Sequence, residues 1–232
     1  MNIVILLAGG VGTRMGQAIP KQFICVNDKP IIVYTLLSLQ KHKEIDAIQA
    51  VCVNGWEKVL SDYAIKFNIT KLQGVISGGK SRYESIRAGI DALGKLDDND
   101  VVIVHDAVRP LVSAYSITDT IRVCKMYGNA MTTVMCTDTM YIKDNDICTS
   151  CTFDRERLIC GQTPEGILAK HIHDMYIKAD ARNIQNDSIS ALQNAIGWKI
   201  YFAKGEKSNI KLTTGEDIDL FKALLALKQK GE

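Results

Sequence analysis

The sequence predicts an α/β fold in which a mostly parallel sheet lies between two layers of helices, a Rossmann-like three-layer α/β/α arrangement. Apolar runs rich in Ile, Val and Leu occupy Met1–Leu7, Ala47–Val53 and Val101–Val104, and such runs are typical of strands buried on both faces. Helical patterns separate these runs, and strands that alternate with helices favour parallel pairing through right-handed crossovers. No linker, repeat or low-complexity tract interrupts the 232 residues, which we therefore expect to form a single domain.

The remaining elements follow from the same patterns. Helices are predicted where apolar residues recur at helical spacing, over Pro30–His42, Trp56–Phe67, Ser81–Leu93, Tyr115–Tyr127, Ser190–Ile196 and Glu216–Lys228. Further strands are predicted at Val75–Ser77, Ala130–Met135 and Lys199–Ala203. Two β-segments, Asp138–Ile142 and Thr152–Arg155, flank a polar turn. A hairpin of this size is marginally stable alone in water, so we expect residues 138–155 to project as an arm that packs against a second subunit.

Composition excludes several classes of protein. Hydrophobic residues make up 47% and charged residues 23% of the chain, which is ordinary for a globular protein, and a net charge of +2 argues against a dedicated nucleic-acid binder. No stretch approaches twenty uninterrupted apolar residues, and no secretory signal is recognisable, so we expect neither a membrane span nor export. The seven cysteines are an odd number in apolar contexts, which suits reduced thiols in the cytoplasm. Cys148-x-x-Cys151 lacks the further ligands, at suitable spacing, that a zinc site needs.

The loop after the first predicted strand is rich in glycine and is followed by positive charge. It runs Ala8-Gly9-Gly10-Val11-Gly12-Thr13-Arg14-Met15-Gly16, and its glycines let the backbone turn N–H groups toward an anion. Arg14 adds a planar fork of hydrogen-bond donors, and Lys21 adds a compact positive charge. Strand, glycine loop and two cations together predict a cradle for a triphosphate. The alternative is a tight turn beside two solvated basic residues.

Two well-known phosphate-binding motifs do not fit this loop. The dinucleotide-binding pattern G-x-G-x-x-G, begun at Gly10, needs glycine where Met15 stands, and the P-loop ending G-K-[ST] is absent. A literal P-loop match does occur at Gly74-x4-Gly79-Lys80-Ser81, and it leaves a small-molecule kinase as an alternative function. Against that alternative, Val75-Ile76 has the composition of a strand where the motif needs a loop.

A second polar cluster, His105-Asp106-Ala107-Val108-Arg109-Pro110, follows another predicted strand. Because the carboxyl ends of parallel strands meet at one edge of a sheet, the glycine loop, Gly78-Gly79 and Asp106 are expected to form one composite site. Asp106 is placed to hold Mg²⁺ against phosphate oxygens, and Arg109 to pair with a substrate phosphate. The alternatives are a helix-capping Asp with an Arg partner, and a metal phosphohydrolase, for which four histidines leave too few ligands.

Five segments, in this order, resemble the nucleotidyltransferases that make CDP-alditols, which include the 2-C-methyl-D-erythritol 4-phosphate and ribitol 5-phosphate cytidylyltransferases. The segments are Leu7–Met15 with Pro20-Lys21-Gln22-Phe23, Arg82–Ile86, Val104–Pro110, Gly161–Pro164, and Asn209–Thr213. The resemblance implies a nucleotidyltransferase fold, Mg²⁺, and a reaction in which CTP and an alditol phosphate give a CDP-alditol and pyrophosphate. Leu7-Ala8-Gly9-Gly10 and Trp56 look more like the ribitol 5-phosphate enzymes, which would serve cell-wall or capsule synthesis. The methylerythritol enzymes of isoprenoid synthesis remain the alternative.

The resemblance also implies roles for individual residues. Catalytic roles are implied for Arg14, Lys21 and Lys211. Nucleotide contacts are implied for Leu7, Ala8, Gly9, Gly10, Gly12, Thr13, Gly79, Ser85 and Asp106, of which Asp106 would also bind the metal. Acceptor contacts are implied for Arg109, Thr139, Arg155 and Thr163. Two positions depart from the family pattern: Glu165 stands in place of Gln, and Asn186-Asp187-Ser188 stands where methylerythritol enzymes usually read Thr-Asp.

The arm has a counterpart in the same family, which uses a projecting arm to dimerise and to complete the acceptor site of its partner. Thr139 and Arg155 match the arm residues that touch the acceptor. We therefore expect a homodimer in which Arg155 of one chain completes the site built by Arg14 of the other.

Overall fold

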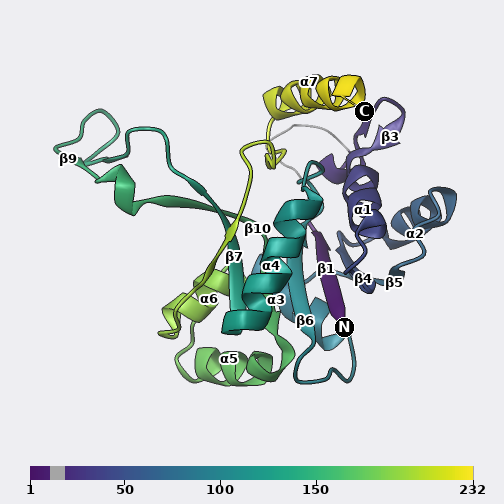
Figure 1. Ribbon diagram of the computed structural model, residues 1–232, viewed down its shortest axis with the longest axis horizontal. Helices are drawn as coiled ribbons and strands as arrows, with labels where there is room; N and C mark the ends of the chain where they lie inside the picture. The colour runs from purple at the N-terminus through teal and green to yellow at the C-terminus, as the bar shows by residue number, and fades with distance from the viewer. Residues whose placement is uncertain (11–18, 232) are drawn as a thin grey trace.

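The structure, a computed structural model, describes residues 1–10 and 19–231. Its main sheet has seven strands in the order β11-β7-β10-β6-β1-β4-β5 (Figure 1). The predicted strands at the centre are confirmed as β1 (Asn2–Ala8), β4 (Ala47–Cys52) and β6 (Val101–Asp106), and all three are fully buried. Their pairing is parallel, with Leu7 opposite Val51 of β4 and Asp106 of β6. The sequence thus predicted the centre of the sheet correctly.

Helices cover both faces of the sheet, which confirms the three-layer arrangement (Figure 1). Even-numbered residues of β1, such as Leu6, pack with α1 (Ile31–Lys41), α2 (Glu57–Lys66) and α4 (Ala114–Tyr127). Odd-numbered residues of β1, such as Ile5, lie in a second core. The helices of that second core are α3 (Arg82–Asp91), α5 (Ala169–Ala181) and α6 (Ile189–Ala195). The alternation of side chains along one strand therefore supplies both cores.

The last helix, α7 (Gly215–Gly231), packs above the carboxyl end of the sheet. Phe221 on this helix is fully buried in a third apolar cluster with Ile31, Val108 and Leu212. Leu212 also donates its backbone N–H to the Val108 carbonyl at 2.9 Å. The segment that carries Lys211 is thus fastened to the loop that follows β6, so that distant parts of the sequence meet at this edge.

Several elements differ from those predicted. Strand β5 (Leu72–Ser77) begins earlier than Val75, and β11 (Phe202–Lys204) is shorter and later than expected, while β7 (Asn129–Met135) matches closely. The segment Gly161–Pro164, which resembles a turn, lies inside the long strand β10 (Ile159–Leu168). Strand β10 pairs antiparallel with both β6 and β7, and its register shifts between Gln162 and Glu165. Helix α5 and a small hairpin of β2 (Cys25–Val26) and β3 (Lys29–Pro30) were not predicted.

The P-loop alternative is wrong. The motif needs a loop from Gly74 to Lys80, but Gly74 lies within β5, where it is paired with Gln49 of β4, and the strand continues to Ser77. A backbone hydrogen-bonded into a sheet cannot wrap its N–H groups around a phosphate. Lys80 and Ser81 instead precede α3, where the Ser81 hydroxyl caps the helix by accepting from the Glu84 N–H at 3.1 Å.

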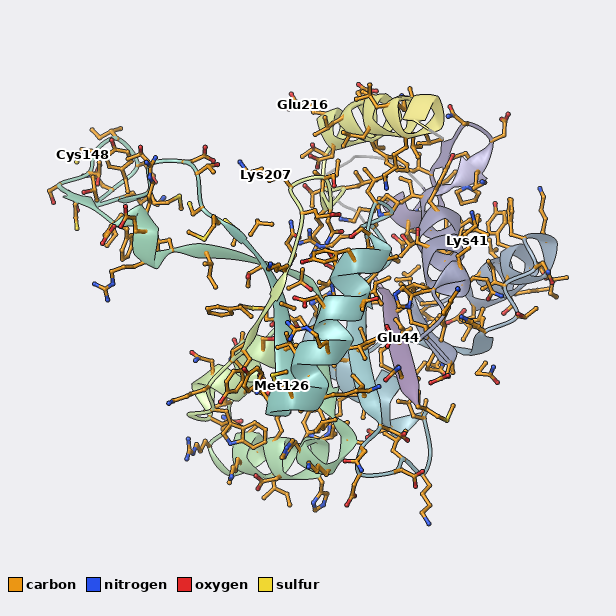
Figure 2. All side chains as sticks on the ribbon, in the orientation of Figure 1. Lys41, Glu44, Met126, Cys148, Lys207 and Glu216 are labelled. Atoms are coloured by element: carbon orange, nitrogen blue, oxygen red, sulfur yellow. The ribbon has the colours of Figure 1, made fainter. Side chains whose placement is uncertain are left out.

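The predicted arm projects from the body, between the ends of β7 and β10 (Figure 1). Its hairpin is shorter than expected, with only two residues in each of β8 (Tyr141–Ile142) and β9 (Cys151–Thr152), followed by a short 3-10 helix, η3 (Arg155–Arg157). Every residue from 138 to 155 is exposed in the isolated chain. Figure 2 places Cys148 at the far end of the arm, well away from the sheet. Within the described part of the chain, no helix is long and apolar enough to cross a lipid bilayer.

Candidate active site

A cavity of about 320 Å³ lies at the carboxyl ends of the central strands, where the two polar clusters were expected to meet. Its walls come from the end of β1, from the residue after Pro20, from the start of α3, from the end of β6 and from the segment before α7. The lining residues are Leu7, Ala8, Gly9, Gly10, Lys21, Gln22, Gly79, Lys80, Ser81, Arg82, Ser85, Asp106, Val108 and Lys211. The structure thus brings together nine residues to which the sequence assigned a nucleotide or catalytic role: Leu7, Ala8, Gly9, Gly10, Lys21, Gly79, Ser85, Asp106 and Lys211.

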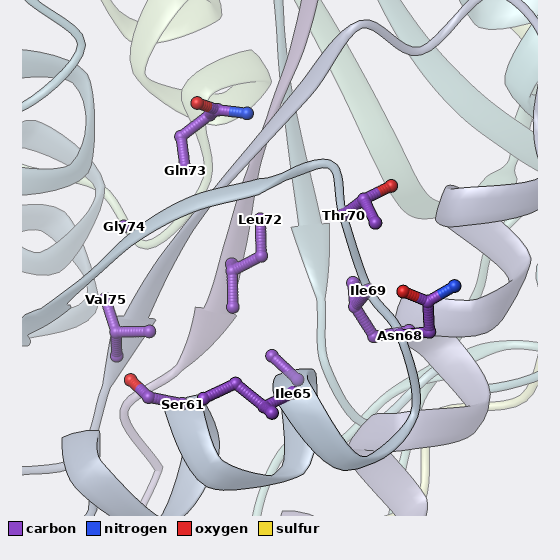
Figure 3. Close-up of a pocket in the computed structure, with 10 residues that line it drawn as sticks. Ser61, Ile65, Asn68, Ile69, Thr70, Leu72, Gln73, Gly74 and Val75 are labelled. Atoms are coloured by element: carbon purple, nitrogen blue, oxygen red, sulfur yellow. The ribbon is translucent and has the colours of Figure 1, made fainter.

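A second hollow, of about 410 Å³, lies on the outer edge of the sheet between α2 and β5 (Figure 3). Ser61 and Ile65 of α2 face Leu72 and Val75 across it. None of its ten lining residues carries an ionisable side chain. This hollow therefore has no charged group to attract a phosphate. The cavity at the strand ends is lined instead by four cationic residues, Lys21, Lys80, Arg82 and Lys211, and by the carboxylate of Asp106.

The first wall of the cavity is held by the end of β1. The Ala8 carbonyl accepts hydrogen bonds from the Val53 N–H at 3.0 Å and from the buried Gln22 amide at 2.6 Å. Gln22 belongs to the short 3-10 helix η2 (Lys21–Phe23), whose Phe23 ring stacks on Trp56 with centroids 4.7 Å apart. Since the Gln22 side chain ties this helix to the strand end, the neighbouring Lys21 is brought to the edge of the cavity.

Ser85 lies between two glycine segments at the cavity, Gly9-Gly10 and Gly78-Gly79. Its hydroxyl accepts from the Gly79 N–H at 3.1 Å and donates to the Ser81 carbonyl at 2.8 Å. A Cβ atom at Gly79 would lie 2.4 Å from Cβ of Glu84, and one at Gly78 would lie 3.0 Å from Oγ of Ser85. Only glycine fits Gly79 without movement of the start of α3. The wall opposite the first glycine segment is therefore closely packed, with Gly79 against Glu84 and Gly78 against Ser85.

Asp106 is the centre of charge at this site. Its carboxylate, on a residue only 3% exposed, is 2.5 Å from Nη1 of Arg82, 3.1 Å from Nζ of Lys211 and 3.5 Å from Nε of Arg109. Burial alone raises the pKa of Asp106, but the charges of Arg82, Lys211 and Arg109 outweigh burial and hold that pKa well below its usual range. Asp106 is therefore ionised at neutral pH, and three cations around one carboxylate leave a net positive charge that suits phosphate.

Arg82 is a cavity residue with contacts to two other segments, and sequence reasoning assigned it no role of its own. The sequence placed Arg82 only within a segment, Arg82–Ile86, that resembles the family. In the structure Arg82 lines the cavity, and of the three cations around Asp106 it lies nearest to the carboxylate. Its guanidinium also donates, through Nε, to the carbonyl of Asp187. The signal that could have found it is its place at the start of a helix that follows Gly78-Gly79, since the first turn of such a helix faces the strand ends.

His105 and Thr163 hold the backbone of Asp106 from the inside. The Asp106 N–H donates to the Thr163 hydroxyl at 3.1 Å, and that hydroxyl is 3.0 Å from Nδ1 of His105. His105 is completely buried, and burial is the main reason that its pKa falls to about 4, so it is neutral at pH 7. A neutral ring with its proton on Nε2 accepts from Thr163 and donates to the Arg109 carbonyl at 3.4 Å. His105 thus supports the strand end and does not face the cavity.

The residues predicted to contact the acceptor substrate do not all lie at the cavity. Thr163 is 4% exposed and its hydroxyl is used within the protein, so contact with a substrate stays a prediction. Arg109 is nearly buried and donates from Nη1 to the Asn209 carbonyl at 2.7 Å. Thr139 and Arg155 lie on the arm, where Nη1 of Arg155 is 3.4 Å from the Thr137 carbonyl, and neither lines the cavity of its own chain.

Three further predicted residues cannot be placed in this geometry. Gly12, Thr13 and Arg14 lie outside the described residues, so their contribution to a triphosphate cradle stays a prediction.

Cys148 and Cys151 are exposed free thiols, and no group of three or more possible metal ligands occurs in the described ranges.

Comparison with known proteins gives a consistent result over the whole chain. Residues 2–227 match the family model of IspD, 2-C-methyl-D-erythritol 4-phosphate cytidylyltransferase. The chain is 40% identical to a ribitol-5-phosphate cytidylyltransferase of Lacticaseibacillus paracasei, over 99% of this chain and 100% of that protein. It is 38% identical to a 2-C-methyl-D-erythritol 4-phosphate cytidylyltransferase of Clostridium botulinum, over 97% of each chain.

Solved structures agree with the sequence comparison. The 4-diphosphocytidyl-2C-methyl-D-erythritol synthase from Anaerococcus prevotii is similar, with a TM-score of 0.81 and 29% identity over 97% of this chain and 98% of that one. The 2-C-methyl-D-erythritol 4-phosphate cytidylyltransferase from Thermus thermophilus shares the fold, with a TM-score of 0.77 at 22% identity over 97% of this chain and 98% of that one.

Proposed function

The chain belongs to the IspD family of cytidylyltransferases, and we propose that it transfers a cytidylyl group from CTP to D-ribitol 5-phosphate, which gives CDP-ribitol and pyrophosphate. As a nucleotidyltransferase it must hold a triphosphate and a phosphorylated acceptor together. One observation carries this proposal: the cavity at the strand ends combines two glycine segments, Lys21, Arg82, Lys211 and a single buried carboxylate, Asp106.

Such a cavity is suited to displacement at phosphorus because little covalent work is required of the protein. A phosphate oxygen of the acceptor attacks the α-phosphorus of CTP in line, a new P–O bond forms, and the bond to the bridging oxygen breaks as pyrophosphate leaves. Lys21 and Lys211 stabilise the negative charge that accumulates around the α-phosphate. Arg14 and the first glycine segment hold the triphosphate, while Gly79 and Ser85 face the cytosine ring.

The residues at this cavity fit a Mg²⁺ ion that is shared between the protein and the substrate phosphates. Mg²⁺ at such sites is held by one or two carboxylates together with substrate phosphates and water, and Asp106 supplies one carboxylate at the cavity wall. Both of its oxygens already pair with cations, so the metal would share Asp106 with Arg82 and Lys211. When bound, the ion would neutralise charge on the triphosphate and orient the α-phosphate.

We place the acceptor between the cavity and an arm from a second subunit. The arm carries large apolar residues that are exposed to solvent: the exposed fraction is 57% for Tyr141, 94% for Ile147 and 49% for Phe153. Such exposure is unfavourable in an isolated chain and typical of a surface that binds a partner. A homodimer would cover them and bring Thr139 and Arg155 of one chain toward Arg109 and Lys211 of the other. Seven free thiols suit a reducing compartment, and we place the enzyme in the cytoplasm.

The test is a screen of pyrophosphate release with the four ribonucleoside triphosphates against a panel of alditol phosphates. We expect release with CTP and ribitol 5-phosphate, and much less with any other pair. The main competitor is 2-C-methyl-D-erythritol 4-phosphate, since relatives of both names match at similar identity. Faster release with methylerythritol phosphate would move the enzyme from cell-wall or capsule synthesis to isoprenoid synthesis. No release with any pair would overturn the proposal.

A further inference from the structure

Glu165 is a buried carboxylate that the proposed reaction does not use. It lies on β10, opposite Val104 of β6, and only 5% of its surface is exposed. It does not line the cavity. A carboxylate is costly to bury unless donors surround it, so its presence here calls for an explanation in terms of the groups that it binds.

Both carboxylate oxygens of Glu165 accept hydrogen bonds from the start of α6. Oε1 accepts from the Ser188 hydroxyl at 2.7 Å, and Oε2 accepts from the Ile189 N–H at 3.2 Å. A glutamine could offer only one acceptor oxygen to these two donors, because its other atom is an NH₂ group. Burial raises the pKa of Glu165, and the Ser188 hydroxyl and the Arg82 charge oppose that rise. The two oxygens of Glu165 are therefore matched to the two donors at the start of α6.

That segment leads directly to the cavity. The residue before Ser188 is Asp187, and its carbonyl accepts from Nε of Arg82. The same guanidinium donates from Nη1 to Oδ1 of Asp106 at 2.5 Å. The Arg82 guanidinium is thus held between the carbonyl of Asp187, in the segment that Glu165 fixes, and the carboxylate of Asp106 at the cavity wall. A planar guanidinium with two fixed acceptors has little freedom to turn.

We propose that Glu165 is a positioning residue, which fixes segment 187–189 and so orients the Arg82 guanidinium on Asp106 for the reaction. This inference rests on the proposed function for its catalytic consequence. Its structural part, the dependence of Arg82 on Glu165, does not. The competing explanation is that Glu165 merely stabilises α6, a helix of seven residues, with no effect that passes through Arg82.

A double-mutant cycle separates these two explanations. Glu165→Gln should lower kcat/KM about tenfold in the wild-type background, mainly through kcat, and less than about twofold in an Arg82→Ala background, because coupled residues are not additive. If Glu165→Gln lowered kcat/KM by the same factor in both backgrounds, the proposal would be overturned. Asp180→Asn is the matched control, since Asp180 pairs with Arg87 of the same helix at 3.0 Å without touching Arg82, and it should leave kcat/KM unchanged.

A second measurement does not depend on any substrate. In ¹⁵N-arginine-labelled protein, the Arg82 Nε–H resonance, identified by its loss in Arg82→Ala, should shift and exchange faster in Glu165→Gln but not in Asp180→Asn. Should Glu165→Gln fail to fold, Ser188→Ala removes one of the two donors and should give the same shift, while Ser188→Thr should restore it. An unmoved Arg82 resonance in folded variants would overturn the proposal. If the Arg82 resonance shifted but the protein released no pyrophosphate, the proposed function would be wrong. The dependence of Arg82 on Glu165 would still stand.

Discussion

The cavity wall and the arm are opposites in how the chain supports them. At the cavity wall, Asp106 is buried, three cations surround its carboxylate, and Thr163 fixes its backbone. On the arm every residue from 138 to 155 is exposed, and the contact of Lys207 with Thr137 lies at the base of the arm. One region is organised by contacts within the chain, whereas the other is left uncovered by the described residues of its own chain.

This difference indicates how the two halves of the proposed site divide the work. A preorganised charged wall stabilises the transition state because its groups need not move during the reaction. An exposed arm cannot do this alone, since two strands of two residues each are too short to be stable unsupported. We therefore propose that the acceptor half depends on assembly and that the nucleotide half does not.

The largest effect is expected at Asp106. Asp106→Asn removes the negative charge that pairs with Arg82, Lys211 and Arg109, and turnover in Mg²⁺ should fall by about 10³-fold. Steady-state pyrophosphate release over a Mg²⁺ titration measures this, with far-UV circular dichroism to establish that the variant is folded. A variant whose dependence on Mg²⁺ matches that of the wild type would remove Asp106 from the mechanism.

Two lysines at the same cavity should differ sharply. Lys21→Ala should lower kcat by about 10²-fold, because in the proposed reaction the charge of Lys21 acts on the transition state. Lys80→Ala should change kcat less than about threefold, since Lys80 is exposed at the start of α3. Each lysine thus serves as the control for the other. If Lys80→Ala were the inactive variant and Lys21→Ala the active one, the assignment of the phosphate site would be reversed.

A smaller effect, on assembly, is expected from the arm. Ile142 is 44% exposed in the isolated chain, so Ile142→Ala should raise the dimer dissociation constant about tenfold and change the free energy of unfolding of the body by less than about 0.5 kcal/mol. Ile5→Ala is the matched variant in the body, where Ile5 is fully buried, and should lower that free energy by about 2–5 kcal/mol. Analytical ultracentrifugation and urea titration measure the two quantities. An unchanged dissociation constant in Ile142→Ala would separate the arm from dimerisation.

The same contrast explains what the sequence could predict. Strands β1, β4 and β6 are apolar runs whose composition is set by burial on both faces, so their place and parallel pairing could be read directly. Strand β10 was missed because Gly161, Pro164 and Gly166 interrupt its pattern and because it pairs antiparallel in a mostly parallel sheet. Local patterns carry no information about such a partner, which is chosen by the tertiary structure.

The candidate site divides in the same way. Lys21, Gly79 and Asp106 could be predicted because each follows a strand or a glycine segment within a recognisable stretch of sequence. The contact of Arg82 with Asp106, and the link from Glu165 through Ser188 to Arg82, join residues far apart in the chain. Only the folded structure brings these together, so the support of the site was less predictable than its chemistry.

The most direct test of a site shared between the cavity wall and the arm is complementation. Lys21→Ala and Arg155→Ala homodimers should each be nearly inactive. In a mixed dimer one site carries both changes and the other carries neither. Equal amounts that re-pair at random make about half of the dimers mixed, so about a quarter of wild-type pyrophosphate release should return in a symmetric dimer. Recovery no greater than the sum of the two variants measured alone would place Arg155 in the site of its own chain, and would contradict the shared site.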